Sequence, residues 1–212
     1  ADDGVLYSRL VDATLDLGLP GNADLDGLYL VDEDTFYLSF NRDGGTAVPG
    51  LGTVQDEDVV FYDAGNWSLF FDGSVCGLDA VHTQDVDAIH LETGVLYFST
   101  LGGGNGNPVS GVDAPYDDAD VYTWSPGATR CGRVFDASQN GLPSAADIDG
   151  LSVRNGIFYM SFNRNGGTTV PGVGSVQDES VVSYDGTMWS LYFAGEGLGT
   201  TNGQDIDAVH VP

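Results

Sequence analysis

Short runs of apolar and aromatic residues recur along the whole chain, and each is bounded by Gly, Asn or Asp. Within a run, apolar and polar positions alternate, or Val, Tyr and Phe follow one another, and both patterns are typical of β-strands. No segment keeps the 3.6-residue period of an amphipathic helix for the length that a helix needs. Brief turn sequences such as DED, ETG and DGT separate the members of successive pairs of runs. The pattern therefore predicts antiparallel hairpins and an all-β fold.

An acidic signature opens every predicted hairpin. The motif is Asp-x-Asp, with a Ser-ended variant at 178, and it stands at residues 24, 56, 85, 118, 147, 178 and 205. Four of these openings follow Gln, in QDED, QDVD, QDES and QDID. In a series of up-and-down hairpins, every first strand begins at the same end of the sheet. All seven openings are therefore expected on one face of the molecule.

The hairpins belong to a longer repeat of about 60 residues. Residues 147–193 realign closely on residues 24–71, and residues 85–136 form a diverged copy. We expect a single domain, 1–212, with three full repeats at 24–84, 85–146 and 147–204.

The two ends of the chain complete this pattern. Residues 205–212 supply only a first strand, whereas residues 1–23 contain a last strand similar to that at 133–142. Closed propellers join their ends in this way, so we expect a β-propeller-like ring of about 14 strands with one split repeat. The split repeat lacks its two middle strands. A ring of seven two-stranded units, a sandwich, and pairing of the split halves between molecules are therefore alternatives.

The amino-acid composition excludes some classes of binding partner. The net charge is −26, with six Arg and no Lys, so no basic patch exists for nucleic acid or an anionic membrane. No apolar run approaches the roughly 20 residues of a membrane-spanning helix. The chain has 27 Asp against 5 Glu. Asp is favoured on turns and in oxygen-ligand cages, although general acidity, as in a salt-loving host, is the alternative.

The acidic openings predict calcium sites. Carboxylates crowded on one face repel one another, and residues i and i+2 of a strand point the same way, toward one cation. Ca²⁺ accepts six to eight oxygen ligands in loose geometry. The alternative is that the first Asp of each pair accepts backbone N–H bonds in an Asx-type turn. The candidate ligand groups are Asp24 and Asp26 with Asp56 and Asp58; Asp85 and Asp87 with Asp118 and Asp120; Asp147 and Asp149 with Asp178; and Asp205 and Asp207 in the split repeat.

The two cysteines are not expected to bond within one chain. Cys76 is predicted in a connecting loop on the acidic face, and Cys131 just after a turn on the opposite face. A strand of about six residues spans about 20 Å. That length exceeds the Cα separation of about 7 Å that a disulfide tolerates. Unless the loop folds back, an intermolecular disulfide or two free thiols fit better.

The carboxylates are not expected to be catalytic. They recur almost identically in every repeat, whereas an acid–base pair needs unlike environments. No Gly-x-Ser-x-Gly elbow, phosphate loop or Cys–His signature is present. Trp67 and Trp189 match each other in WSLFF and WSLYF and favour core packing over a sugar-stacking platform. His90 and His210 share a strand position and are interpreted as half-buried side chains.

The motifs DVDAIH, VLYFS, PGLGTVQDEDVVFYD and WSLFFDGS resemble repeats of secreted, mostly uncharacterised bacterial proteins of propeller type. The resemblance implies an extracellular or cell-surface setting and a propeller-like fold, and it carries over no catalytic residue. The leading hypothesis is a secreted, calcium-stabilised structural protein. It would assemble with itself by strand complementation in an extracellular filament or surface layer. A glycan-binding module of lectin type is the alternative, and a glycoside hydrolase is the third hypothesis.

Overall fold

The structure is a computed structural model of the chain. It describes residues 10–41, 44–78, 84–101, 108–163, 167–195 and 206–211. These residues form sixteen β-strands and one short 3₁₀ helix, η1 (Gly73–Cys76). The predicted all-β class is confirmed. Within the described ranges, no helix has the length and apolar character needed to cross a membrane.

Twelve of the strands form three antiparallel sheets of four strands each. Sheet 1 has the order β1 (Leu25–Asp32), β2 (Thr35–Phe40), β5 (Val59–Asp63), β6 (Asn66–Phe71). Sheet 2 has the order β7 (Asp85–Glu92), β8 (Val95–Leu101), β9 (Val121–Trp124), β10 (Gly132–Phe135). Sheet 3 has the order β11 (Ile148–Arg154), β12 (Ile157–Phe162), β15 (Ser180–Tyr184), β16 (Trp189–Ala194).

Two small hairpins were not predicted. They project from the connections between the second and third strands of sheets 1 and 3, which the sequence pattern had indicated as long loops. Their three-residue strands are too short to register as separate runs. The hairpins are β3 (Thr46–Val48) with β4 (Gly52–Val54), and β13 (Thr168–Val170) with β14 (Gly174–Val176).

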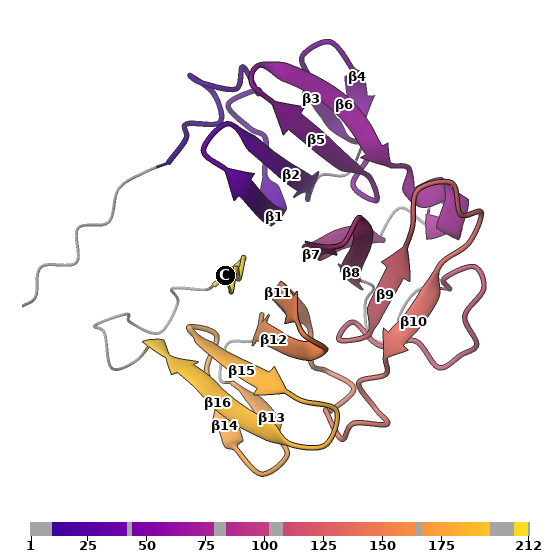
Figure 1. Ribbon diagram of the computed structural model, residues 1–212, viewed down its shortest axis with the longest axis vertical. Coiled ribbons are helices and arrows are strands. Elements are labelled where there is room, and N and C mark those ends of the chain that lie inside the picture. The colour runs from indigo at the N-terminus through magenta and orange to yellow at the C-terminus, as the bar shows by residue number, and fades with distance from the viewer. Residues whose placement is uncertain are drawn as a thin grey trace, which may run out of the picture.

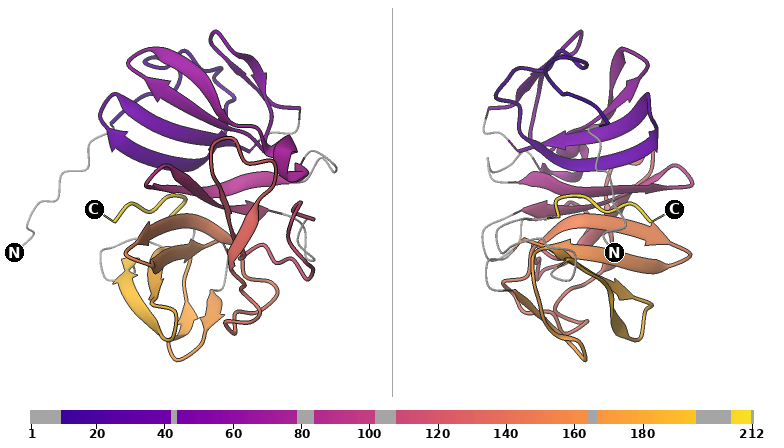
Figure 2. Two further views of the ribbon diagram at one scale, coloured as in Figure 1. Left: turned by 45° about the vertical axis from the view of Figure 1, so that its right-hand side comes forward. Right: turned by 90° about the vertical axis from the view of Figure 1, so that its left-hand side faces the viewer.

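The three sheets stand around a common centre (Figure 1). The first strand of each sheet, β1, β7 or β11, lies innermost, and residues 206–211, the C-terminal segment, run beside β11. Figure 2 shows this segment between sheet 1 and sheet 3. The sheets are separate, and the described residues do not close a ring. We call the side between sheet 1 and sheet 3 the fourth sector; among the described residues it holds 10–23 and 206–211, and no sheet.

Apolar clusters fill the spaces between the sheets. One cluster joins sheets 1 and 2 around Phe71, and a second joins sheets 2 and 3 around Phe135. In a third cluster, Leu17 and Leu19 from the N-terminal region cover the face of sheet 1 that looks away from sheet 2. Burial of both faces explains why the strands of sheet 2 contain so many apolar residues.

A serine in the second strand links neighbouring innermost strands. Ser99 Oγ accepts a hydrogen bond from the N–H of Ala88 in its own sheet, at 3.1 Å. The same hydroxyl donates to the carbonyl of Ile148 in sheet 3, at 2.9 Å. In the next sheet, Ser161 Oγ donates to the carbonyl of Ile206 in the C-terminal segment, at 2.7 Å. Each bond holds one innermost strand against the next.

In sheet 1 the equivalent serine is Ser39, and the first-strand residue that faces it must be small. The N–H of Gly27 donates to Ser39 Oγ at 2.8 Å. A Cβ on Gly27 would lie 2.6 Å from that hydroxyl and 3.1 Å from the carbonyl oxygen of Asp87. Glycine therefore allows β1 and β7 to approach closely, and it explains the small residue that follows each first-strand Asp-x-Asp motif.

The prediction for the cysteines is wrong, because Cys76 and Cys131 form an intrachain disulfide with Cα atoms 5.4 Å apart. The chain after β6 folds back as η1 instead of staying at the acidic end. The carbonyl of Cys76 accepts from Ser110 N, whose own carbonyl accepts from Cys131 N. Strand β9 also has only four residues, so the distance to be crossed is shorter than assumed.

Removal of the disulfide should destabilise the fold without changing it. We expect the Cys76→Ser/Cys131→Ser variant to lose about 2–5 kcal/mol of unfolding free energy in urea denaturation. Reduction of the wild-type protein should give the same loss, and reduction of the variant should give none. Two free thiols in the non-reduced, denatured wild-type protein would contradict the bond.

Candidate functional site

The Asp-x-Asp motifs of the three innermost strands converge at the centre of the molecule. Because β1, β7 and β11 lie side by side, their acidic openings become neighbours across three sheets. Electrostatic interactions link Asp26 to Asp85 and Asp147, and Asp87 to Asp147 and Asp149. We call this group the central acidic cluster: Asp24, Asp26, Asp85, Asp87, Asp147 and Asp149.

The cluster extends from the surface into the interior. Asp24 is exposed, Asp26 and Asp147 are half-buried, and Asp85 is buried. Asp87 retains only 4% of its surface exposed. Oδ2 of Asp26 and Oδ2 of Asp87 are buried and accept no hydrogen bond from an N–H or alcohol O–H group of the described residues. The two carboxyl groups can bond to each other only when one of them holds a proton. A buried carboxylate oxygen without a partner is costly, so these atoms call for a proton or a cation.

Burial and mutual repulsion raise the pKa values of two carboxyl groups in this cluster. Burial, followed by the charges of Asp85, Asp24 and Asp147, raises the pKa of Asp26 from 3.8 to about 7, although an interaction with the carboxyl group of Asp87 lowers it. Burial, followed by the charges of Asp26 and Asp147, holds the pKa of Asp87 well above its usual value. At neutral pH the cluster cannot carry all its negative charges without compensation.

The second-hairpin openings serve a different purpose. Asp58 accepts hydrogen bonds from the N–H of Gly73 at 3.0 Å and of Gln55 at 3.2 Å. Asp120 accepts from the N–H of Ala137 at 2.9 Å and of Asp117 at 3.2 Å. Each carboxylate thus ties the start of the third strand to the end of the fourth. The second Asp of these pairs, not the first, acts as the local backbone cap.

The first Asp of each second-hairpin opening offers its backbone carbonyl to the next sheet. In each case the donor is the second residue of an innermost-strand Asp-x-Asp motif, so the same bond recurs around the centre. The three bonds run from Val86 N to Asp56 O (3.0 Å), from Ile148 N to Asp118 O (3.3 Å) and from Ile206 N to Asp178 O (3.4 Å).

The structure therefore groups the candidate ligands by strand position rather than by repeat. The charges that act on Asp58 are those of Asp72 and Asp56. Those that act on Asp26 are Asp85 and Asp147, from the openings of the other two innermost strands, and Asp24 of its own motif. Asp207 lies exposed on the C-terminal segment. Asp205 lies outside the described residues.

A second acidic group contains Asp136, which the sequence analysis does not include among the candidate ligands. Carboxylate oxygens of Asp117, Asp120 and Asp136 lie within 4.8 Å of one another. The guanidinium of Arg133 lies 2.9 Å from both Asp120 Oδ2 and Asp136 Oδ2. Arg133 thus forms ion pairs with two of the three carboxylates and offsets part of their charge, so the group is an ion-pair network. The signal in the sequence is the segment Arg-Val-Phe-Asp, in which Arg133 and Asp136, of opposite charge, stand three residues apart.

The aromatic residues near the centre are packing residues. The rings of His90 and His210 lie 5.0 and 5.7 Å from the ring of Tyr29. His90 is buried, and burial together with the neighbouring His210 lowers the pKa of His90 to about 4. His90 is therefore neutral near pH 7 and adds no positive charge to the acidic centre.

Comparison with solved structures gives several distant likenesses. No protein-family model and no curated protein sequence matches the chain. The computationally designed Ika4 protein is similar at 12% identity and a TM-score of 0.36, over 90% of this chain and 100% of that one. The extracellular domain of BT4673 from B. thetaiotaomicron is similar at 13% identity and a TM-score of 0.34, over 86% of this chain and 22% of that one.

A third similar structure is 1,3Gal43A, an exo-beta-1,3-galactanase from Clostridium thermocellum. Its identity is 10% and its TM-score 0.32, over 82% of this chain and 51% of that one. With TM-scores this low, none of these likenesses carries a functional inference.

The raised pKa values of these carboxyl groups predict that the free energy of unfolding decreases as the pH rises. The folded-state pKa of Asp26, about 7, lies above the ordinary aspartate value of 3.8. Its stabilising contribution is complete below the unfolded pKa and is lost as the pH rises through the folded one. In a chelator, the free energy of unfolding from urea titrations should therefore decrease from about pH 4.5 to about pH 8.

The Asp26→Asn/Asp87→Asn variant should flatten this dependence, because it removes two titrating groups with raised pKa. A slope as steep in the variant as in the wild type would show that other groups cause the effect.

Proposed function

We propose that the chain is a secreted structural β-repeat protein whose centre binds calcium. The observation that carries the proposal is the pair of buried carboxyl oxygens, Oδ2 of Asp26 and Oδ2 of Asp87, which no N–H or alcohol O–H group of the described residues satisfies where β1, β7 and β11 meet. A divalent cation among them would offset the repulsion that raises both pKa values.

The donor set favours calcium over other metals. The cluster supplies carboxylate oxygens only, and hard cations prefer such ligands. Zinc usually takes nitrogen or sulfur ligands. Both cysteines are in the disulfide, and His90 belongs to an aromatic group. The three strands also come from separate sheets, and the flexible coordination of calcium suits such a site better than the strict octahedron of magnesium.

The recurring bonds around the centre support a propeller-like ring with a split fourth repeat. Ile206 N bonds to Asp178 O as Val86 N bonds to Asp56 O. We infer that the C-terminal segment takes the place of a fourth innermost strand beside sheet 3. In this arrangement calcium would join the innermost strands of different sheets and stiffen the ring.

An extracellular location agrees with the disulfide, since such bonds persist in oxidising compartments. Within this setting we propose an assembly role, as a subunit of a filament or surface layer, and no catalytic role for the repeated carboxylates. The glycan-binding alternative gains no support from the tryptophans. Trp124 packs on Phe71, and Trp189 on Phe135.

Calcium should raise the thermal stability of the protein at neutral pH. At a calcium concentration of about 100 Kd, binding to the folded state adds about 2.7 kcal/mol. For a chain of this size that corresponds to roughly 5–10 °C in Tm. Differential scanning calorimetry with CaCl₂ and with EGTA measures the shift.

Two variants make this test specific. Asp87→Asn should lose most of the calcium-dependent shift. Asp58→Asn is the matched control, because Asp58 caps backbone groups outside the central cluster; it should lower Tm in both buffers and keep the shift. An identical wild-type Tm in both buffers would refute the calcium site.

Assembly is measured separately by sedimentation velocity over a range of protein and calcium concentrations. We expect species larger than the monomer to grow with protein concentration. A strict monomer under all conditions would count against the filament or surface-layer role and would leave the calcium site standing.

A further inference from the structure

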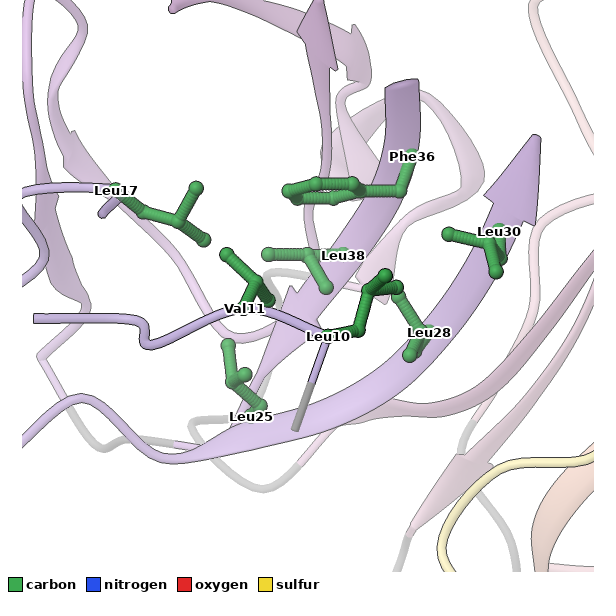
Figure 3. A pocket seen from close by; sticks show the side chains of 8 residues that line it. All are labelled: Leu10, Val11, Leu17, Leu25, Leu28, Leu30, Phe36 and Leu38. Carbon is green, nitrogen blue, oxygen red and sulfur yellow. The ribbon is translucent and has the colours of Figure 1, made fainter. Parts of the chain in front are cut away.

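The interface between sheets 1 and 2 buries polar side chains at positions that are apolar at the next interface. Glu57 stands within its acidic opening as Ala119 does in sheet 2, and Gln84 precedes the motif of β7 as Ala146 precedes that of β11. Both alanines belong to the apolar cluster that joins sheets 2 and 3. The pocket on the other face of sheet 1 is likewise lined by leucine, valine and phenylalanine (Figure 3). Glu57 and Gln84 are nevertheless only 8% and 1% exposed.

The two polar residues change together from repeat to repeat. Sheet 1 has Glu57 followed by Gln84, and sheet 2 has alanine at both positions. Sheet 3 has Glu179, and the position that follows it is Gln204, which lies outside the described residues. Positions that vary together across related copies are expected to be in contact. The pattern therefore indicates that Glu57 and Gln84 form one unit across the interface.

A glycine makes room for the buried glutamate. Gly73 lies against Glu57, and a Cβ at this glycine would be 2.6 Å from the Cγ atom of the glutamate. Gly195 has the same relation to Glu179, with a distance of 2.9 Å. In sheet 2, where the glutamate is absent, the equivalent residue is Ala137. The chain thus provides space for this carboxyl group in each sheet that has it.

The side chain of Gln84 is directed toward sheet 1. The N–H of Val86 donates to the carbonyl of Asp56 at 3.0 Å, which fixes the start of β7 beside the opening of β5. Val86 is fully buried in the cluster that joins sheets 1 and 2. Residues two apart in an extended chain point to the same side, so Gln84 faces this interface too. Its Oε1 and Nε2 atoms are buried and have no hydrogen-bond partner among the described residues.

Two carboxyl groups accompany this amide. Asp56 is 7% exposed, and its side chain interacts with that of Glu57. Burial, followed by this interaction, raises the pKa of Glu57 to about 8, and the charges that act on it, those of Asp58 and Asp56, are both negative. Asp58 itself is engaged by the N–H groups of Gly73 and Gln55. Asp56 and Glu57 therefore need a proton or a cation between them.

We propose that Asp56, Glu57 and Gln84 bind a hard divalent cation between sheet 1 and sheet 2. Two carboxylates and an amide oxygen are ligands that Ca²⁺ and Mg²⁺ both accept, with water completing the coordination. The cation would satisfy Oε1 of Gln84 and offset the repulsion between the carboxylates. It would tie the opening of β5 to the start of β7. Its ligands differ from those of the central acidic cluster, and neither site depends on the other.

Equilibrium dialysis at pH 8 followed by elemental analysis counts the bound cations, with Ca²⁺ and Mg²⁺ in separate arms. The Glu57→Ala/Gln84→Ala variant introduces the residues that sheet 2 has at these positions, and it should bind about one cation fewer than the wild type. An equal count in both arms would overturn the proposal and would indicate that the two carboxyl groups share a proton.

A second variant preserves the shape of the side chain. Glu57→Gln removes one carboxylate with little change in volume, and it should weaken binding at this site by about tenfold or more in a cation titration. Circular dichroism and Tm establish that each variant is folded. Unchanged cation affinity in folded Glu57→Gln would also overturn the proposal.

Two further variants make the test specific. Glu33→Ala is the matched control for the lost negative charge, because Glu33 lies on the exposed turn between β1 and β2; it should bind as many cations as the wild type. Asp87→Asn alters the central acidic cluster and should keep the cation between the sheets. A cation lost only in Glu57→Ala/Gln84→Ala would support this site and count against the central one, and a cation lost only in Asp87→Asn would do the reverse.

Discussion

The close approach of the innermost strands is the contact on which the rest of the structure depends. A serine hydroxyl bridges one innermost strand to the next, as Ser99 does between Ala88 and Ile148. The bridge requires a residue without a bulky side chain opposite the serine, which Gly27 provides in sheet 1. Since the same small residue follows the Asp-x-Asp motif, the contact that joins the sheets also draws the carboxylates together.

This coupling explains why the acidic residues divide into two groups. In the third strands, which lie away from the centre, Asp58 and Asp120 find backbone N–H groups and become structural caps. In the first strands no such donors satisfy Oδ2 of Asp26 and Oδ2 of Asp87, because each neighbour is another acidic strand. The same motif thus caps backbone N–H groups at one radius and brings carboxyl groups of neighbouring strands together without such donors at another.

The sequence was sufficient for the elements that depend on local pattern. Alternating runs and turn sequences identify the hairpins, and their period identifies three similar sheets. The radial position of a strand has no local signature, which is why the candidate ligands were grouped by repeat and not by strand position. The path of the connection after β6 has no local sequence signature either, which is why the sequence alone does not predict the bond between Cys76 and Cys131. In the sequence Arg133 is an isolated charge, and its position between Asp120 and Asp136 follows only from the packing of β10 in the folded sheet.

In an open array of repeated sheets, each sheet between two neighbours buries both faces, but the first and the last sheet each keep one uncovered face. Solenoid proteins cover such faces with polar capping repeats, and closed rings have none. Here the end faces are apolar: Leu25 and Leu28 on sheet 1 and Phe193 on sheet 3 retain the residue types of interior positions. Full burial of a side chain of this size stabilises a protein by about 1.5–3 kcal/mol. Covering these end faces therefore contributes free energy to the fold in the same way as the contacts between sheets 1 and 2 and between sheets 2 and 3.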